Sequence, residues 1–423
     1  MNRLDWVLKR LRRRIWFRAG LISAAGILLA ALSGLAGRII PYEFHADLGQ
    51  DAVGTILQIL ASSMLAVTTF SLTAMVTAYG SATQLATPRA TQLMREDPTS
   101  QNALSTFLGA FVFSIVGIIG LQTGIYGSQG RVVLFAGTLA LVAVVVATLL
   151  RWIDHITAFG RMSDVIDRVE DAAARSMAAF ARDPQQGGRP AVAVPDAARR
   201  LHGERVGYVS HVDVPGLCRV AADADLVLHV QAVPGTLVHP ARPLLCVEGR
   251  VDDAVAARLT DAFTIERHRA FDHDPRLGVI ALAEIASRAL APATNDPGTA
   301  IEVMNALLRV FLTLSPAGED ERNADGRVEL PPVHVARPSI EDFIGDAFEP
   351  ILREGVAEVE VSIRLSKTLA ALHQALPQAR SATAAYARRL QENVDRRQDD
   401  PRARGVFEAA HAASWGAPST ARA

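Results

Sequence analysis

Residues 52–80 read AVGTILQILASSMLAVTTFSLTAMVTAYG, without a single Asp, Glu, Lys, Arg or His. A helix needs about 20 apolar residues to cross the hydrocarbon core of a bilayer. Three further apolar runs lie at 19–40, 104–126 and 132–150, and only the first contains a charge, Arg38, at its edge. A soluble helix has a charged face, whereas these runs are apolar all round. We therefore predict a membrane protein whose residues 1–150 form a four-helix transmembrane domain.

The whole chain of 423 residues has a mixed composition. Hydrophobic residues make up 50% and charged residues 21%, which fits a membrane domain joined to a water-soluble region. The net charge of −1 gives no reason to expect nucleic-acid binding. Cys218 and Cys246 have no metal-ligand spacing, and neither do His268 and His273. We therefore expect no metal, no cofactor and no disulfide.

Basic residues flank the apolar runs unevenly. A cluster of Arg and Lys precedes the first run, whereas the loop at 41–51 has three acidic residues and no Lys or Arg. Cytoplasmic loops of membrane proteins are enriched in Lys and Arg. We therefore expect a multi-pass protein of the bacterial inner membrane with both termini in the cytoplasm. The alternative, a cleaved signal peptide over residues 1–37, has too long an apolar stretch, and three more runs follow it.

Beyond residue 150 the sequence pattern divides the predicted cytosolic region into four parts. Apolar residues three or four apart predict a helical stem. A stretch rich in Pro, Gly and Gln indicates a linker, and the short apolar runs after it are typical of strands. The parts are the stem at 151–182, a linker and small β-barrel-like module at 183–250, a mainly helical domain at 251–398, and a flexible tail at 399–423.

The predicted fold class is a membrane α-helical domain joined to a cytosolic α+β region. The turn pattern of the barrel-like module resembles lipoyl- or biotinyl-type domains. Residues 10–366 contain no lysine, however, so a lysine that carries a cofactor is excluded. The strands are expected at 207–212, 226–233, 236–239 and 244–247. The helices after them are expected at 252–262, 275–290, 297–313, 340–354, 357–376 and 380–398.

The run at 52–80 has small and hydroxyl side chains on one helix face. At 100° per residue this face spans an arc of about 100°. Water can satisfy such groups, so the face can line a pore. It can also pack against another helix, because small residues allow close approach and hydroxyls can bond to a carbonyl one turn earlier. The candidates for pore lining or helix packing are Gln58, Ser62, Thr69, Thr73 and Thr77.

A second candidate site is the segment RALAPATNDPGTA at 288–300. Its Asp-Pro pair predicts the cap and first residue of a helix, and Glu284 and Arg288 have the spacing of an ion pair. One interpretation is an anion or nucleotide site at the start of that helix. The other is a structural turn, because Asp296 already occupies the positive end of the helix. The signature or ligand candidates are Glu284, Arg288, Asn295, Asp296 and Thr299.

This segment resembles the ALSPxxNDPxTA signature of DUF2254, an uncharacterised family of predicted bacterial inner-membrane proteins. The resemblance extends over the basic start, the four apolar runs, the Ser/Thr-rich helix and the barrel-like stretch. Two positions depart from the family pattern: Ala291 replaces the usual Ser, and Glu284 stands where the family usually has Asp. A Ser nucleophile at position 291 is therefore excluded, and the resemblance implies no established activity.

Two functional hypotheses follow. The first is a non-catalytic homo-oligomer in the lipid bilayer, whose Ser/Thr face lines a passive pore or a subunit interface and whose cytosolic part senses or gates. The second is a membrane-anchored cytosolic binding or scaffold module without transport activity. Ion-driven transport is disfavoured because the apolar runs carry no ionisable group at depth. An enzyme is not expected, since no nucleophile–base pair or metal set can be assembled.

Overall fold

The computed structural model describes residues 15–39, 50–85, 87–95, 97–126, 128–314 and 332–416. These residues form two compact units. The membrane unit lies within residues 4–85 and 91–164, and the soluble unit lies within residues 86–90 and 165–423. The predicted loop at 41–51 falls largely outside the described residues.

The described part of the membrane unit is helical, as its apolar runs predict. Three helices are long and apolar enough to cross a membrane, over Ala52–Thr83, Pro98–Gln122 and Gly130–Thr157. The first predicted run falls in α2, where the described apolar stretch, Ala19–Leu28, is shorter than a span. The helices are α2 (Ile15–Ile39), α3 (Gln50–Leu85), α5 (Pro98–Gln122) and α6 (Ser128–Ala158). Helix α4 (Pro88–Arg95) crosses the boundary between the two units, and its residues 88–90 belong to the soluble unit.

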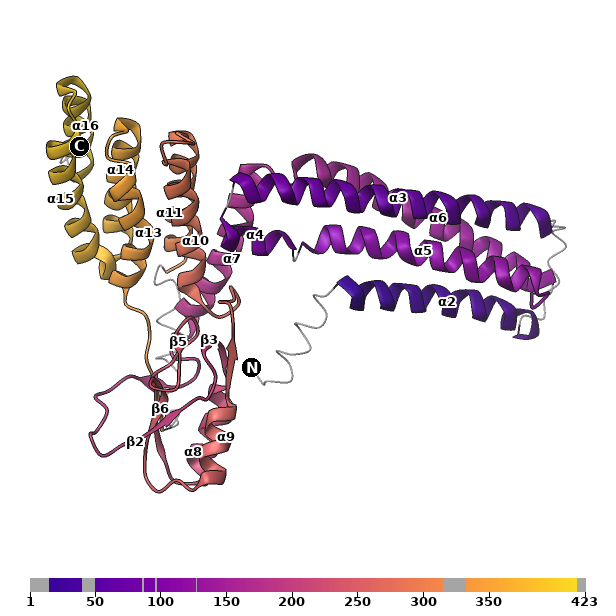
Figure 1. The fold of residues 1–423 in the computed structure, drawn as a ribbon, viewed down its shortest axis with the longest axis horizontal. Helices are drawn as coiled ribbons and strands as arrows, with labels where there is room; N and C mark the ends of the chain where they lie inside the picture. Colours follow the sequence, from indigo (N-terminus) through magenta and orange to yellow (C-terminus); the bar gives the residue numbers. More distant parts are fainter. Residues whose placement is uncertain are drawn as a thin grey trace, which may run out of the picture. The chain divides into compact units, whose positions relative to one another are not determined.

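Helix α5 is central to the membrane unit, where it packs against α2, α3 and α6 (Figure 1). Small residues allow this approach, because a side chain at Gly117 would lie 3.0 Å from Leu57 of α3. Leu57, Phe113 and Leu134 are at most 1% exposed and join α3, α5 and α6 in one cluster. The predicted start of α5 is confirmed, since Asp97 accepts the Ser100 N–H at 2.7 Å.

The predicted stem at 151–182 is interrupted. Helix α6 ends at Ala158, and α7 (Met162–Arg182) begins after a short break. Within the break Gly160 has a φ of +87°, and a side chain there would lie 2.9 Å from the Ala78 carbonyl oxygen. Only glycine combines that backbone conformation with so close an approach. The apolar period continues through this break, so the period alone did not reveal it.

The strands of the soluble unit form two sheets. One has the order β1-β8-β4-β6-β2 and the other β5-β3-β7. Neither sheet closes on itself among the described strands, so the expected barrel-like form is not confirmed, whereas the four predicted strands are present. The strands are β1 (Arg189–Pro190), β2 (Arg199–His202), β3 (Gly207–Val212), β4 (Val227–Val230), β5 (Leu237–Val238), β6 (Pro243–Glu248), β7 (Phe263–Glu266) and β8 (Val333–Val335).

Helices make up the rest of the soluble unit. Helices α8 and α9 pack with the strands, and α10 packs against α11 and α13 (Figure 1). Helix α14 packs against α11, α15 and α16. The six predicted helices are all found. The helices are α8 (Val214–Asp223), α9 (Asp253–Asp261), α10 (Pro275–Ala289), α11 (Pro297–Leu312), α13 (Ile340–Glu354), α14 (Val359–Ala375), the 3₁₀ helix η1 (Pro377–Ala379), α15 (Arg380–Arg397) and α16 (Pro401–Trp415).

The expectation of a flexible tail was wrong for residues 401–415. They form α16, which begins at an Asp400 cap, and its Phe407 is fully buried. The Trp415 ring lies 5.1 Å from that of His373 on α14. Most of the α16 sequence is alanine and polar residues, so its apolar period is weak and tertiary packing decides its position. Residues 417–423 lie outside the described residues.

Helices α7 and α10 cross with almost no space between their backbones at Gly278. A side chain at Gly278 would come within 2.6 Å of the Ala173 backbone. We expect Gly278→Ala to destabilise the soluble unit by about 1–3 kcal/mol through overpacking. Thermal unfolding of the full-length protein in detergent, followed by circular dichroism, measures this. The matched control is Gly345→Ala in α13, where the nearest atom, the Tyr386 hydroxyl, would lie 3.5 Å away. Gly345→Ala should leave the stability unchanged or raise it, because alanine favours the helix more than glycine does. An equal loss of stability in both variants would contradict the close approach of α7 and α10.

Candidate functional sites

The polar face of α3 is exposed along its length. Gln58, Ser62, Thr69, Thr73 and Thr77 are all exposed in the single chain. The structure therefore places all five predicted residues on one open face of the membrane unit.

The opposite face of α3 makes the contacts with the rest of the membrane unit. Val53, Leu57 and Met64 are at most 5% exposed and pack toward α5 and α6. At 100° per residue, these residues lie about half a turn from the polar face. The other described helices of the same chain therefore do not cover the polar face.

Several hydroxyls on this face bond back to their own helix. Ser62, Thr69 and Thr73 donate to carbonyl oxygens three or four residues earlier, at 3.0–3.1 Å. Such bonds satisfy the hydroxyl hydrogens without water. Gln58 is different, because its exposed amide has no hydrogen-bond partner within the described part of the chain. Of these candidates, Gln58 is therefore the side chain that most needs a polar neighbour outside the single chain.

The DUF2254-like segment forms the turn between α10 and α11. Helix α10 is capped at Leu290, and the Asn295 N–H then donates to the Ala291 carbonyl at 2.9 Å. Asn295 has a φ of +45°, a conformation that asparagine adopts more readily than most residues. The Asp296 N–H donates to the Ala289 carbonyl at 2.8 Å. These bonds reverse the chain within a few residues.

Asp296 begins α11 as its N-cap. Its carboxylate accepts the Thr299 N–H at 3.0 Å and the Thr299 hydroxyl at 2.6 Å. The hydrogen bond from the Thr299 hydroxyl, followed by the backbone N–H bonds, lowers the pKa of Asp296 from its usual value. An acidic side chain therefore occupies the helix N-terminus where an anion would bind. The geometry favours the structural-turn interpretation of Asn295, Asp296 and Thr299.

The partner expected for Glu284 was wrong. Glu284 forms its ion pair with Arg89 of α4, within the soluble unit, instead of with Arg288. The side chains of Arg89 and Glu284 are 44% and 32% exposed, so the pair contributes at most about 1 kcal/mol. Arg288 is exposed on α10. Spacing along one helix could not reveal a partner so distant in the sequence.

The soluble unit contains a cavity of about 240 Å³ that the sequence did not predict. Its walls come from α7, the end of β3, the loop before α10 and the segment after β8. The rings of His211 and His273 meet in its lining, with centroids 5.0 Å apart. The Nε2 atoms of both rings are buried. His273 stands out in the sequence only as a residue before a helix, because its neighbour His211 lies on a distant strand.

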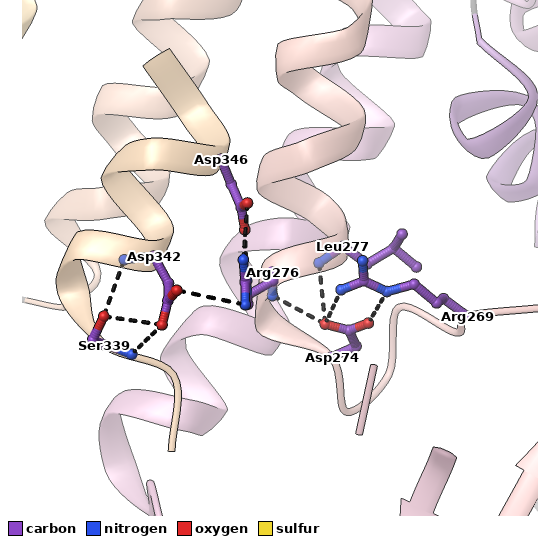
Figure 2. Close-up of polar contacts among 7 residues, drawn as sticks. All are labelled: Arg269, Asp274, Arg276, Leu277, Ser339, Asp342 and Asp346. Atoms are coloured by element: carbon purple, nitrogen blue, oxygen red, sulfur yellow. Dashed lines mark hydrogen bonds and ion pairs between the residues drawn. The ribbon is translucent and has the colours of Figure 1, made fainter. Parts of the chain in front are cut away.

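Two arginine–aspartate pairs fix the loops around this cavity (Figure 2). Arg269 makes two hydrogen bonds to Asp274, at 2.6 and 2.9 Å, and Asp274 also caps α10. Arg276 makes two to Asp346, at 2.6 and 3.0 Å, which joins the start of α10 to α13. Bidentate pairs of this kind are geometrically specific as well as strong.

A capping box fixes the start of α13, next to the cavity-lining residue Pro338. The Ser339 hydroxyl accepts the Asp342 N–H at 3.1 Å, and the Asp342 carboxylate accepts the Ser339 N–H at 2.9 Å (Figure 2). Hydrogen bonds from Ser339, the backbone N–H first, lower the pKa of Asp342. Because Pro338 lines the cavity, this cap holds one wall in place.

The family described as "Predicted membrane protein (DUF2254)" matches residues 12–371, which include parts of both units. The chain belongs to this family. The resemblance seen in the ALSPxxNDPxTA segment is thereby confirmed. A membrane protein with long apolar helices and an α+β soluble region agrees with the family description.

Proteins of two mycobacteria are similar to the chain over most of its length. The uncharacterized proteins Mb1321c of Mycobacterium bovis and Rv1290c of Mycobacterium tuberculosis are each 26% identical to it over 398 residues. The alignment covers 88% of this chain and 74% of each relative. No solved structure matches the chain.

The left-handed conformation of Asn295 can be tested by a pair of substitutions. Asn295→Ala should destabilise the protein by about 1–2 kcal/mol, because the Cβ of alanine disfavours φ > 0 and its methyl group cannot form the local hydrogen bonds that an asparagine side chain can. Asn295→Gly should change stability by less than about 0.5 kcal/mol, because glycine adopts this conformation freely. Chemical denaturation of the full-length protein in detergent measures both. An alanine variant as stable as the glycine variant would contradict the assigned conformation.

The lowered pKa of Asp296 predicts a pH dependence. The folded state holds this proton less tightly than the unfolded state, whose pKa is about 3.9. The stabilisation is therefore complete above about pH 4 and is lost as the pH falls through the lower folded pKa. Asp296→Asn keeps a capping oxygen but does not titrate. At neutral pH this variant should be less stable than the wild type by the contribution of the charge, and its further loss of stability in acid should be smaller.

Thermal unfolding across the acid range measures this difference. Asp395→Asn, on an exposed position of α15, is the matched control. Acid unfolding of Asp296→Asn that coincides with the wild type would contradict the role of the carboxylate.

Proposed function

We propose that this protein is a non-catalytic homo-oligomer of the bacterial inner membrane, in which the polar face of α3 lines a passive pore or the interface around it. The observation that carries this proposal is the exposure of the whole face, from Gln58 to Thr77, directly opposite the packed face of α3. The soluble unit, in this proposal, senses a ligand or gates the pore.

The chemistry of the α3 face supports an assembly over direct contact with lipid. A side-chain amide placed in hydrocarbon without a partner costs several kcal/mol, on the order of 2–7. Gln58 avoids this cost if a second copy or water meets it. The small residues along the same face allow another helix to come close. Further copies of the chain are therefore the partners we propose, together with the bilayer.

The absence of charge at depth supports passive permeation. Proton relays and ion-coupled carriers need ionisable groups inside the membrane. The three candidate spans have no Asp, Glu, Lys or His between residues 52 and 80, 104 and 126, or 132 and 150. Hydroxyls on a helix face can support water without driving transport.

We further propose that α2 is a fourth span and that both termini are cytoplasmic. Helix α2 has 25 residues and packs against α5 and α6. Its length suits a span, and the basic residues before it favour a cytoplasmic N-terminus. An even number of spans then places the C-terminal region on the same side. The test is a reporter enzyme that works only in the periplasm, fused after residue 416. We expect this fusion to be inactive, and activity would contradict the proposed topology.

Removal of hydroxyls from the α3 face tests the pore. Full-length protein in liposomes should pass ions or small solutes, and Thr69→Val with Thr73→Val should reduce the flux several-fold, because an apolar lining excludes water. Valine has nearly the shape of threonine, so packing changes little. Thr68→Val is the matched control, because Thr68 lies off the face and bonds to the Met64 carbonyl at 2.6 Å.

The assembly is measured separately, by native mass spectrometry in detergent or nanodiscs. We expect an oligomer in the wild type and its weakening in Gln58→Leu. A monomer without flux would overturn the whole proposal. If the wild type is an oligomer but shows no flux, and the Thr69 and Thr73 substitutions leave the oligomer unchanged, the pore is excluded. The proposal that the α3 face is a subunit interface would then remain.

A further inference from the structure

We propose that the cavity of about 240 Å³ in the soluble unit binds a small organic cation, an amine with a compact apolar body. This inference rests on the cavity alone and is independent of the proposed pore.

The charge of the cavity lining selects against anions. Asp183 and Asp272 line it, and the lining contains no Arg or Lys. A pocket with carboxylates and no positive side chain attracts cations and repels phosphates and carboxylates. The rings of His211 and His273 lie against each other in the same lining, with centroids 5.0 Å apart, so the acidic groups of the lining are left to provide the acceptors for an amine.

The remaining walls suit an organic body. Prolines, valines and alanines make up most of the other lining residues, and Phe180 adds an aromatic ring. Ligand pockets are mostly apolar with a few polar groups that fix the orientation. An aromatic ring also attracts a cation over its face. The Phe180 ring is held by an edge-on contact with Phe343 at 5.4 Å, so it is positioned before any ligand arrives.

A metal ion fits this cavity less well. Within the described residues, no group of three or more His, Cys, Asp or Glu side chains could hold a metal. The two imidazoles therefore lack the further ligands that a protein metal site requires. An amine needs only hydrogen-bond acceptors and a negative field, both of which the lining supplies.

The walls are held in one arrangement by bonds outside the cavity. Asp274 follows His273 in the chain, and its two bonds to Arg269 fix that loop. Asp183 accepts the Gly187 N–H at 3.0 Å, which fixes the turn after α7. A pre-formed site binds with less loss of conformational entropy than one that must be ordered.

Three molecules with the same body test the charge preference. Benzylamine, benzyl alcohol and benzoate differ chiefly in charge, and their binding to full-length protein in detergent can be followed by ligand-observed NMR. Choline, a quaternary ammonium ion, and putrescine, a diamine, extend the set of organic cations. We expect at least one amine to bind with a dissociation constant of about 1 mM or lower, and benzoate to show no binding. Benzyl alcohol controls for uptake into the detergent.

Substitutions that preserve shape locate the site. Asp183→Asn and Asp272→Asn should each weaken amine binding by about 2- to 5-fold, since both carboxylates are solvent-exposed. The double variant should lose about 10-fold. Asp395→Asn on α15 is the control and should bind as the wild type does.

Four results would overturn the proposal. They are no binding by benzylamine, choline or putrescine, benzoate binding as tightly as benzylamine, cation affinity unchanged in the double variant, and saturation by Zn²⁺ alone where the organic cations fail. Because the measurement is of binding in detergent, it is independent of flux, and failure here leaves the pore proposal to its own test.

Discussion

The hydrocarbon core of the bilayer imposes the constraint on which the membrane unit depends. A chain in hydrocarbon must satisfy its backbone N–H and C=O groups internally, and a helix does this within one segment. The long apolar helices α3, α5 and α6 meet this requirement. Serine and threonine are tolerated there because Ser62, Thr69 and Thr73 bond to their own helix. Gln58 on the same face has no such bond within the described part of the chain.

Directional polar contacts organise the soluble unit in a different way. Five helices, α5 of the membrane unit and α8, α10, α11 and α16, begin with an aspartate cap and a proline in the first turn. The cap satisfies free N–H groups and the proline sacrifices no bond. Bidentate arginine–carboxylate pairs then join separate elements, as Arg389 of α15 does with Glu349 of α13 at 2.7 and 2.8 Å. Fixed elements leave a cavity with a defined lining.

The predicted elements agree with the structure where the determinant is local. The starts of α5, α10 and α11 follow from Asp-Pro pairs, and β3 has the predicted bounds. The break at Gly160 was missed because a left-handed glycine does not disturb the apolar period. Helix α16 was not predicted because few large apolar residues lie on its buried side. Phe407 is buried only through contacts with segments that are distant in the sequence.

The candidate sites divide in the same manner. The sequence by itself determined the apolar spans, the polar face of α3 and the turn at Asn295–Asp296, because helix period and capping depend on residues only a few positions apart. Only the tertiary structure decided that the α3 face is uncovered, that Glu284 pairs with Arg89, and that His211 meets His273. Each of these is a contact, or a lack of one, between segments far apart in the chain. The sequence pattern around each residue does not reveal such contacts, because the packing of whole helices and strands brings these segments together.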